Sequence, residues 1–133
     1  MDLALVEHQA VERDGGAMNE ELPRILRAAY EAFGFPPRIA NDRGPRGKLR
    51  HAGQDARMLY VYLARTRTLR SYAEIRNAVT GDPSYSASGF IDNFRRARRC
   101  LDRDASVPTR GGPRPFRLLV EAAAIRLDRG EAA

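Results

Sequence analysis

Proline and glycine divide this 133-residue chain into short segments, and that division limits what it can fold into. Gly34 ends a first apolar segment, and "FPPRIANDRGPRGKLRH" after it contains three prolines and two glycines. Gly81 and Pro83 interrupt the chain again, and "SVPTRGGPRP" interrupts it a third time. Both residue types are unfavourable inside helices. The chain is therefore expected to form several short helices joined by loops.

Between these interruptions apolar residues recur at helical spacing, and no segment alternates with period two. We expect helices from Asn19 to the Gly34 stop, from about Gln54 to Arg65, from Ser71 to Thr80, after Ser86 or Ser88, and near Phe116–Arg129. Leu69 is expected to be the apolar plug of the bridge between the second and third helices. The predicted core residues are Leu22, Ile25, Leu26, Ala29, Phe33, Ala56, Leu59, Tyr60, Leu63, Ile75, Ala78, Val79, Phe90, Ile91, Phe94, Ala97, Leu101, Leu118, Leu119, Ala122 and Ile125. The predicted fold class is all-α.

The stretch from Ser71 to Arg99 has the pattern of a helix-turn-helix. "SYAE" is a capping box, in which the Ser71 hydroxyl accepts the Glu74 amide proton and the Glu74 side chain reaches back to Ser71. Gly-Asp-Pro then ends the first helix, and the second carries arginines away from its apolar stripe. In DNA-binding proteins with this motif the second helix enters the major groove.

Charge is distributed unevenly along the chain. The net charge is +6, yet residues 1–37 carry −4 and residues 43–103 carry +9. Lys48 is the only lysine, which is typical of codon choice in a GC-rich genome, so the placement of arginine carries more weight than its abundance. A positive middle segment favours a polyanion partner. The alternative is a set of solvated helix faces.

The sequence lacks the residue patterns that several classes of function require. The single cysteine, Cys100, excludes an internal disulfide and is expected to be a buried thiol. His8 and His51 have no metal-ligand spacing, and no nucleophile has a base nearby, so we expect neither a metal, nor a cofactor, nor an enzyme. The chain has no signal-peptide pattern and no apolar run long enough to span a bilayer. We expect a cytoplasmic, nucleoid-associated protein.

The order of features from about Leu22 to Arg103 resembles the C-terminal DNA-binding domain of the replication initiator DnaA (domain IV, TrpR-like superfamily). The matching stretches are "ILRAAYEAFGF" for the linker helix, "NDRGPRGKLRHAGQDARMLYVYLAR" for the basic loop and next helix, and "SYAEI" and "GFIDNFRRA" for the helix-turn-helix. "DPSYSAS" replaces the family's Arg-Asp-His signature, so DnaA-box specificity is not expected. No Walker motif is present, so the initiator's ATPase activity is not expected either.

The resemblance implies a division into a flexible or weakly helical segment at 1–17, a DnaA-like DNA-binding domain at 18–104, and a linker with a C-terminal helix at 105–133. Tyr60, Tyr62 and Tyr72 are expected to pack rather than to stack on bases. Helix-turn-helix geometry gives as base-reading candidates Ser84, Tyr85, Ser86, Ser88, Asp92, Asn93, Arg95 and Arg96. The resemblance implies a second set of candidates, for the backbone or the minor groove: Arg43, Arg46, Lys48, Arg50, Arg57, Arg65, Thr68 and Arg99.

The expected function is sequence-specific binding of double-stranded DNA in transcription regulation, with activation of phage, prophage or gene-transfer-agent genes suggested by the resemblance. The last helix is expected to form a homodimer or to contact RNA polymerase or another regulatory protein. Two alternatives remain open: an adaptor that binds RNA polymerase or the replication machinery, and a replication factor that binds a plasmid or phage origin.

Overall fold

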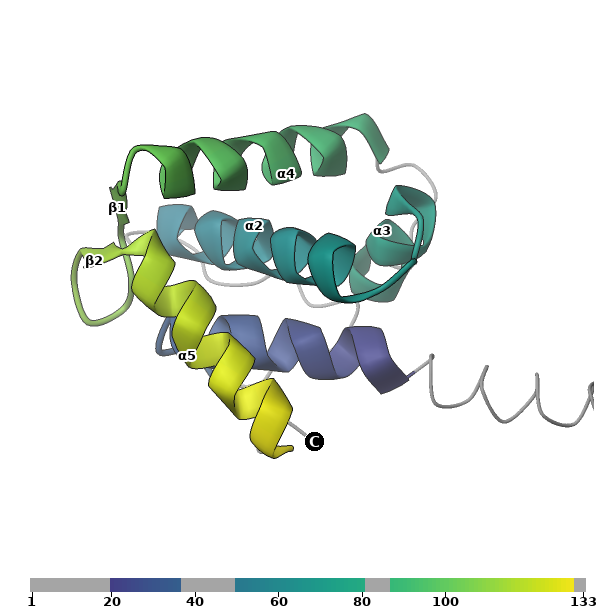
Figure 1. The fold of residues 1–133 in the computed structure, drawn as a ribbon, viewed down its shortest axis with the longest axis horizontal. Helices are drawn as coiled ribbons and strands as arrows, with labels where there is room; N and C mark the ends of the chain where they lie inside the picture. Colours follow the sequence, from purple (N-terminus) through teal and green to yellow (C-terminus); the bar gives the residue numbers. More distant parts are fainter. Residues whose placement is uncertain (1–19, 37–49, 81–86, 131–133) are drawn as a thin grey trace, which may run out of the picture.

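The computed structural model describes residues 20–36, 50–80 and 87–130 (Figure 1). Within these ranges the chain forms five helices and one two-stranded antiparallel sheet, so the all-α class is confirmed. In chain order the elements are a helix at residues 20–32, α2 (Arg50–Arg67), α3 (Tyr72–Thr80), α4 (Ala87–Asp102), β1 (Ser106–Val107), β2 (Arg114–Pro115) and α5 (Phe116–Arg129).

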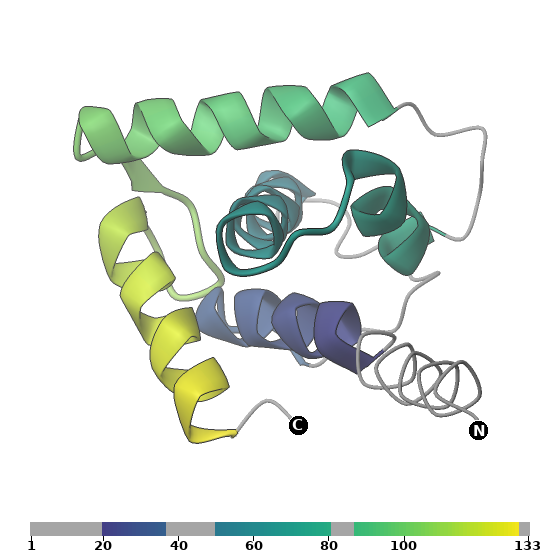
Figure 2. The ribbon, with the colours of Figure 1, turned by 45° about the vertical axis from the view of Figure 1, so that its right-hand side comes forward.

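Helix α2 lies at the centre, and the other helices surround it. Figure 2 shows α2 nearly end-on, with α4 on one side, the helix at residues 20–32 on the opposite side, and α3 and α5 on the two flanks. Its predicted apolar face is buried in full. Met58 and Val61, outside that face, are completely buried as well, because neighbours cover α2 on several sides.

The bounds of α2 differ from the prediction at both ends, since the helix begins at Arg50 rather than near Gln54 and ends at Arg67 rather than Arg65. Gly53 lies inside the first turns and is buried. A glycine inside a helix costs about 1 kcal/mol relative to alanine. Burial of Ala52 in the core offsets that cost. Asp55, expected in the first turn of this helix, consequently lies in its second turn.

The apolar face and the end of the helix at residues 20–32 agree with the prediction, whereas its expected start, Asn19, lies outside the described residues. All five residues of the expected face, from Leu22 to Phe33, are buried. Gly34 adopts a φ of +88°, in the left-handed region that favours glycine. The Phe35 amide donates to the Tyr30 carbonyl at 2.9 Å, which closes the helix end. Gly34 is therefore the stop that the sequence indicated.

The prediction that Leu69 plugs the bridge between α2 and α3 is wrong. Its relative exposure is 103%, which means that nothing covers it. Thr68 holds the bridge instead, because its hydroxyl donates to the Ala64 carbonyl at 2.6 Å and accepts from the Arg70 amide at 3.1 Å. Polar capping of the end of α2 thus replaces the expected apolar contact.

The predicted apolar face of α5 is only partly correct. Leu119 is buried, but Leu118 and Ile125 are 43% and 48% exposed. Phe116, the first residue of α5, is fully buried and turns the helix so that Leu119 and Ala123 follow it into the core. Successive steps of three and four residues from Phe116 leave Leu118 and Ile125 on the outer side.

A short hairpin within "SVPTRGGPRP" was not predicted. Ser106 pairs with Pro115 and Val107 pairs with Arg114 in antiparallel register. The Phe116 amide donates to the Ala105 carbonyl at 2.9 Å and joins the hairpin directly to α5. Buried side chains of the hairpin and α5 belong to the same core as those of α2 and α4.

Candidate nucleic-acid interface

The two helices of the predicted helix-turn-helix are α3 and α4, which pack on each other and on α2. The capping box of α3 forms as expected: the Glu74 amide donates to the Ser71 hydroxyl at 3.2 Å, and the Ser71 amide donates to the Glu74 carboxylate at 3.1 Å. Hydrogen bonds from Ser71 and from the Arg70 guanidinium lower the pKa of Glu74. The residues that connect α3 to α4, 81–86, lie outside the described ranges.

An aromatic cluster holds the helix pair on α2. The rings of Tyr62 and Phe94 stack with centroids 5.8 Å apart, and Tyr72 meets Phe94 edge-on at 6.5 Å. Tyr60 is fully buried and donates its hydroxyl to the Ile75 carbonyl at 2.8 Å. Burial raises the pKa of Tyr60. All three tyrosines therefore pack between helices, as expected.

Helix α4 turns one side to α2 and the other outward (Figure 1). Phe90 and Ala97 are buried on the inner side, and Phe94 and Leu101 pack partly buried beside them. The exposed side of α4 carries residues from both the base-reading and the backbone-contact predictions, namely Ser88, Asp92, Arg95 and Arg99. Asn93 is half-buried at the edge of this side. Ser88 lies inside α4, which begins at Ala87, so it does not cap the helix.

Arg96 is bound to another helix rather than directed only at solvent. Its guanidinium forms an ion pair with the Asp55 carboxylate of α2. The Asp55 side chain is 10% exposed and the Arg96 side chain 46%. Burial raises the pKa of Asp55 even though Arg96 opposes that shift. Arg96, one of the two arginines expected to read bases, thus links α4 to α2.

Two residues of the predicted backbone-contact set stabilise the α2–α3 turn. Arg65 donates to the Arg70 carbonyl at 2.8 Å, and its guanidinium lies 4.4 Å from the centre of the Tyr72 ring. Thr68 caps α2, as described above. Arg57 is half-buried, and its Nε atom is buried with no hydrogen-bond partner in the described part of the chain. Arg99 is exposed near the end of α4.

Several candidates from both predicted sets lie outside the described residues. They are Ser84, Tyr85, Ser86, Arg43, Arg46 and Lys48, together with the side chain of Arg50. The structure thus brings Ser88, Asp92, Arg95 and Arg99 together on one face of α4, whereas Arg96 pairs with Asp55 of α2. The expected basic loop lies outside the described residues.

The sequence prediction missed two exposed arginines on the hairpin, Arg110 and Arg114. The available signal was the Gly111-Gly112 pair between them, since paired glycines are typical of tight hairpin turns. The surrounding prolines favoured an unstructured linker instead.

The described residues contain no group of three or more histidine, cysteine or acidic side chains arranged to hold a metal. Cys100 is half-buried against the core, and burial raises the pKa of its thiol. In the described ranges no helix is both long and apolar enough to cross a membrane. Compared with known proteins, the chain has no match among family models, curated proteins or solved structures.

Proposed function

We propose that the protein binds double-stranded DNA through the outer face of α4 and regulates transcription. The observation that carries this proposal is the row of exposed side chains Asp92, Arg95 and Arg99 on one side of α4, which follows a capped helix. Arg103 is exposed in the turn directly after α4. Arginine and asparagine supply the paired hydrogen bonds that distinguish bases in the major groove.

The middle of α4, at Asn93 and Arg95, reads the bases in this proposal. Arg95 is highly exposed, and its ion pair with Asp92 is long, at 4.0 Å, so its guanidinium can exchange that contact for guanine at little cost. Asn93, half-buried at the edge of the face, suits adenine. Arg99, further along α4, and Arg103, in the turn directly after it, meet phosphates. Arg96 supports the helix through Asp55 rather than reading a base.

Selection of bound sequences from a random pool of duplexes tests the proposal directly. We expect enrichment of a short motif by the wild-type chain. Arg95→Ala should reduce discrimination at one position of that motif by roughly 10- to 100-fold, the equivalent of about 1–3 kcal/mol. Arg117→Ala is the control, because it removes the same charge from α5. No enriched motif, or equal effects of the two substitutions, would refute base reading by α4.

A protein-binding adaptor is the second candidate, and α5 favours it. Leu118 and Ile125 are exposed two turns apart on its outer side. Exposed apolar side chains of this kind suit a protein partner such as RNA polymerase, another regulator or a second copy of the chain. The double variant Leu118→Glu/Ile125→Glu should abolish capture of RNA polymerase or self-association in sedimentation without altering DNA binding. Wild-type protein that captures no polymerase and remains a monomer would count against this candidate.

A further inference from the structure

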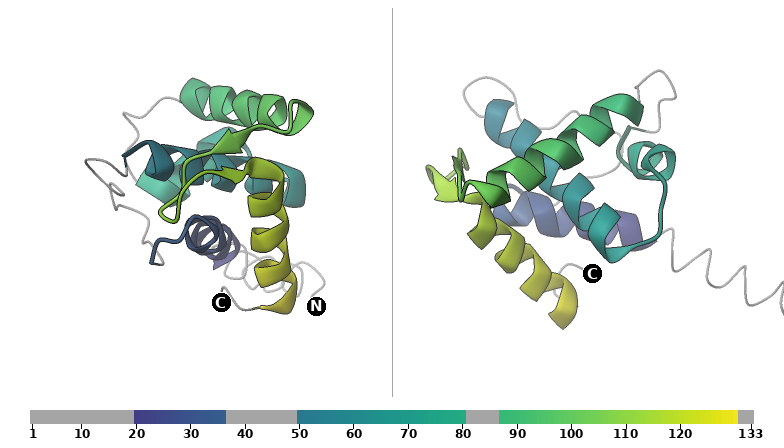
Figure 3. Two further views of the ribbon diagram at one scale, coloured as in Figure 1. Left: turned by 90° about the vertical axis from the view of Figure 1, so that its left-hand side faces the viewer. Right: turned by 45° about the horizontal axis from the view of Figure 1, so that its top comes forward.

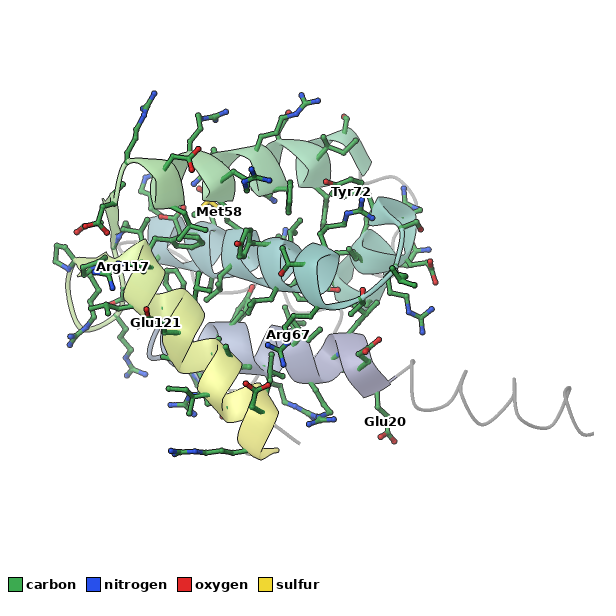
Figure 4. The ribbon with its side chains drawn as sticks, in the orientation of Figure 1. Glu20, Met58, Arg67, Tyr72, Arg117 and Glu121 are labelled. Atoms are coloured by element: carbon green, nitrogen blue, oxygen red, sulfur yellow. The ribbon has the colours of Figure 1, made fainter. Side chains whose placement is uncertain are left out.

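Some arginines of the described chain form an ion pair with a carboxylate, and others do not. Among the described residues, the arginines with a carboxylate partner on another element or one turn away include Arg67, Arg70, Arg95, Arg96, Arg117 and Arg126. Arg117 and its carboxylate partner Glu121 both lie on α5 (Figure 4).

Four exposed arginines have no carboxylate partner in the described part of the chain: Arg99, Arg103, Arg110 and Arg114. All four belong to the stretch that runs from the end of α4 through the hairpin. Arg65 and Arg98 also lack such a partner, but their guanidiniums lie over the rings of Tyr72 and Phe94. The exposed arginines without a carboxylate partner are therefore concentrated at the end of α4 and on the hairpin, in a stretch that also contains the exposed acids Asp102 and Asp104.

The tip of the hairpin is a tight, hydrogen-bonded turn. The Thr109 amide donates to the Gly112 carbonyl at 3.1 Å, and the Gly112 amide donates back to the Thr109 carbonyl at 3.1 Å. The Thr109 hydroxyl also donates to the Gly112 carbonyl, at 2.6 Å, and accepts from the Gly111 amide at 3.2 Å. Gly112 has a φ of +108°, which a side chain would disfavour. These bonds fix the turn in one conformation.

The tip is also fastened to the rest of the fold. The Arg110 amide donates to the Phe33 carbonyl at 3.0 Å, and its guanidinium makes a long bond of 3.5 Å to the Gly34 carbonyl. A side chain at position 34 would place its Cβ 3.2 Å from the Arg110 Cβ, so the glycine allows this close approach. The end of the helix at residues 20–32 thereby holds the hairpin in place.

The hairpin offers charge rather than free backbone donors. The amides of Gly111 and Gly112 are occupied within the turn. A Cβ on Gly111 would lie 3.7 Å from the Arg114 guanidinium, so this guanidinium lies over the turn, and the space beside Gly112 is open. Two guanidiniums with free donors beside a narrow turn suit paired contacts to phosphate oxygens.

We infer that the β1–β2 hairpin is a second DNA contact, which binds phosphodiester groups beyond the C-terminal end of α4. The inference rests on the proposed function, because it assumes that a duplex lies on α4. Figure 3 shows the hairpin at the end of the molecule where α4 terminates, between α4 and the helix at residues 20–32. A hairpin already fixed in position loses little conformational entropy when it binds. Arginines without acidic partners give up no ion pair to reach phosphate.

Measuring the affinity of the full chain for a duplex of random sequence over a series of salt concentrations tests this contact. Each phosphate contact contributes about 0.9 to the slope of log affinity against log salt. Arg110→Ala/Arg114→Ala should therefore lower the slope by nearly 2 and weaken binding roughly 10- to 60-fold at 0.1 M salt. Arg110→Lys/Arg114→Lys should keep most of the slope.

The control is Arg117→Ala/Arg126→Ala, which removes the same formal charge but from arginines that have acidic partners. Equal slopes for the alanine hairpin variant and this control would overturn the inference. So would a hairpin variant that loses binding to an acidic peptide but binds DNA as the wild type does. Thermal unfolding monitors the fold of each variant. Should the double alanine variant unfold, Arg114→Gln alone should still lower the slope by about 0.9.

The two proposals fail separately. If Arg95→Ala leaves sequence discrimination unchanged while the hairpin variant lowers the salt slope, base reading by α4 is refuted and the hairpin contact stands. If Arg95→Ala removes discrimination and the hairpin variant behaves like its control, only the hairpin contact is refuted.

Discussion

At the residue scale, the ion pair between Asp55 and Arg96 shows how a buried partner changes the role of an arginine. From the sequence, Arg96 and Arg95 were equivalent members of one exposed face. Asp55 lies 41 positions away from Arg96, and its burial depends on how α4 crosses α2. The spacing of residues within α4 contains no information about that crossing, so the pair could not be predicted.

Replacing Arg96 by alanine is expected to lower the free energy of unfolding, because the buried Asp55 carboxylate loses its cationic partner. We expect a loss of about 1–3 kcal/mol at pH 7, which is below the cost for a fully buried pair because Arg96 is half-exposed. Arg95→Ala, one position away and highly exposed, should change stability by less than about 0.5 kcal/mol. Urea denaturation of both variants measures the difference, and equal stabilities would contradict a structural role for Arg96.

The loss of unfolding free energy caused by Arg96→Ala should also depend on pH. Burial raises the pKa of Asp55 above its ordinary value of 3.8, so the folded state binds more protons than the unfolded state just above that pH. Stability contributed by such a carboxyl falls as pH rises through this window. Without Arg96 the pKa of Asp55 rises further, so the gap between variant and wild type should narrow as pH is lowered from 7 towards 4. A gap that stays constant in urea denaturation across this range would show that Asp55 is not the cause.

Ser71 makes a second testable contribution at this scale. Ser71→Ala removes the hydroxyl that accepts the Glu74 amide and should cost about 1 kcal/mol of stability. Ser71→Thr retains a hydroxyl at the same position and should cost much less. Thermal unfolding followed by circular dichroism compares the two. Equal losses in both variants would mean that the capping bond does not stabilise α3.

At the scale of elements, several features that depend on local spacing were predicted correctly, although the predicted apolar face of α5 was only partly correct. The five-residue face of the first helix, the Gly34 stop and the capping box of α3 are all present in the structure. The first turn of α2 and the β1–β2 hairpin were missed, because packing outweighs the local preferences of glycine and proline there. The α4 face was predicted from its spacing, whereas the hairpin arginines depend on a turn that the pattern did not indicate.

Gly34 and Gly89 form a matched pair for testing how the hairpin is held. Gly34→Ala should cost about 1–2 kcal/mol, because alanine is strained at a φ of +88° and its Cβ approaches Arg110 closely. Gly89 lies in α4 with open space around it, so Gly89→Ala should stabilise the protein by up to about 1 kcal/mol. Thermal unfolding distinguishes the two. A Gly34→Ala variant as stable as the wild type would mean that the hairpin does not need this close approach.

At the scale of the whole molecule, one core includes side chains from every helix of the described chain. Leu26 of the first helix, Leu59 of α2, Ile75 of α3, Phe90 of α4 and Phe116 of α5 all contribute to it. Residues 105–130 therefore supply buried surface to the same core as the segment that resembles a DNA-binding domain. Phe116 was expected only to begin a helix, since burial against distant segments cannot be read from its neighbours.

Phe116 provides the test of whether the chain unfolds as one unit. Phe116→Ala should lower the free energy of unfolding by about 3–5 kcal/mol, because it empties a fully buried site. Leu118→Ala, two positions away on the same helix but on its outer side, should cost less than about 1 kcal/mol. Far-ultraviolet circular dichroism and tyrosine fluorescence should then give coincident transitions, shifted together in Phe116→Ala, because tyrosines of α2 and α3 share the core with α5. An early loss of helical signal with unchanged tyrosine fluorescence would instead show that α5 unfolds independently of the helices that carry the proposed DNA contact.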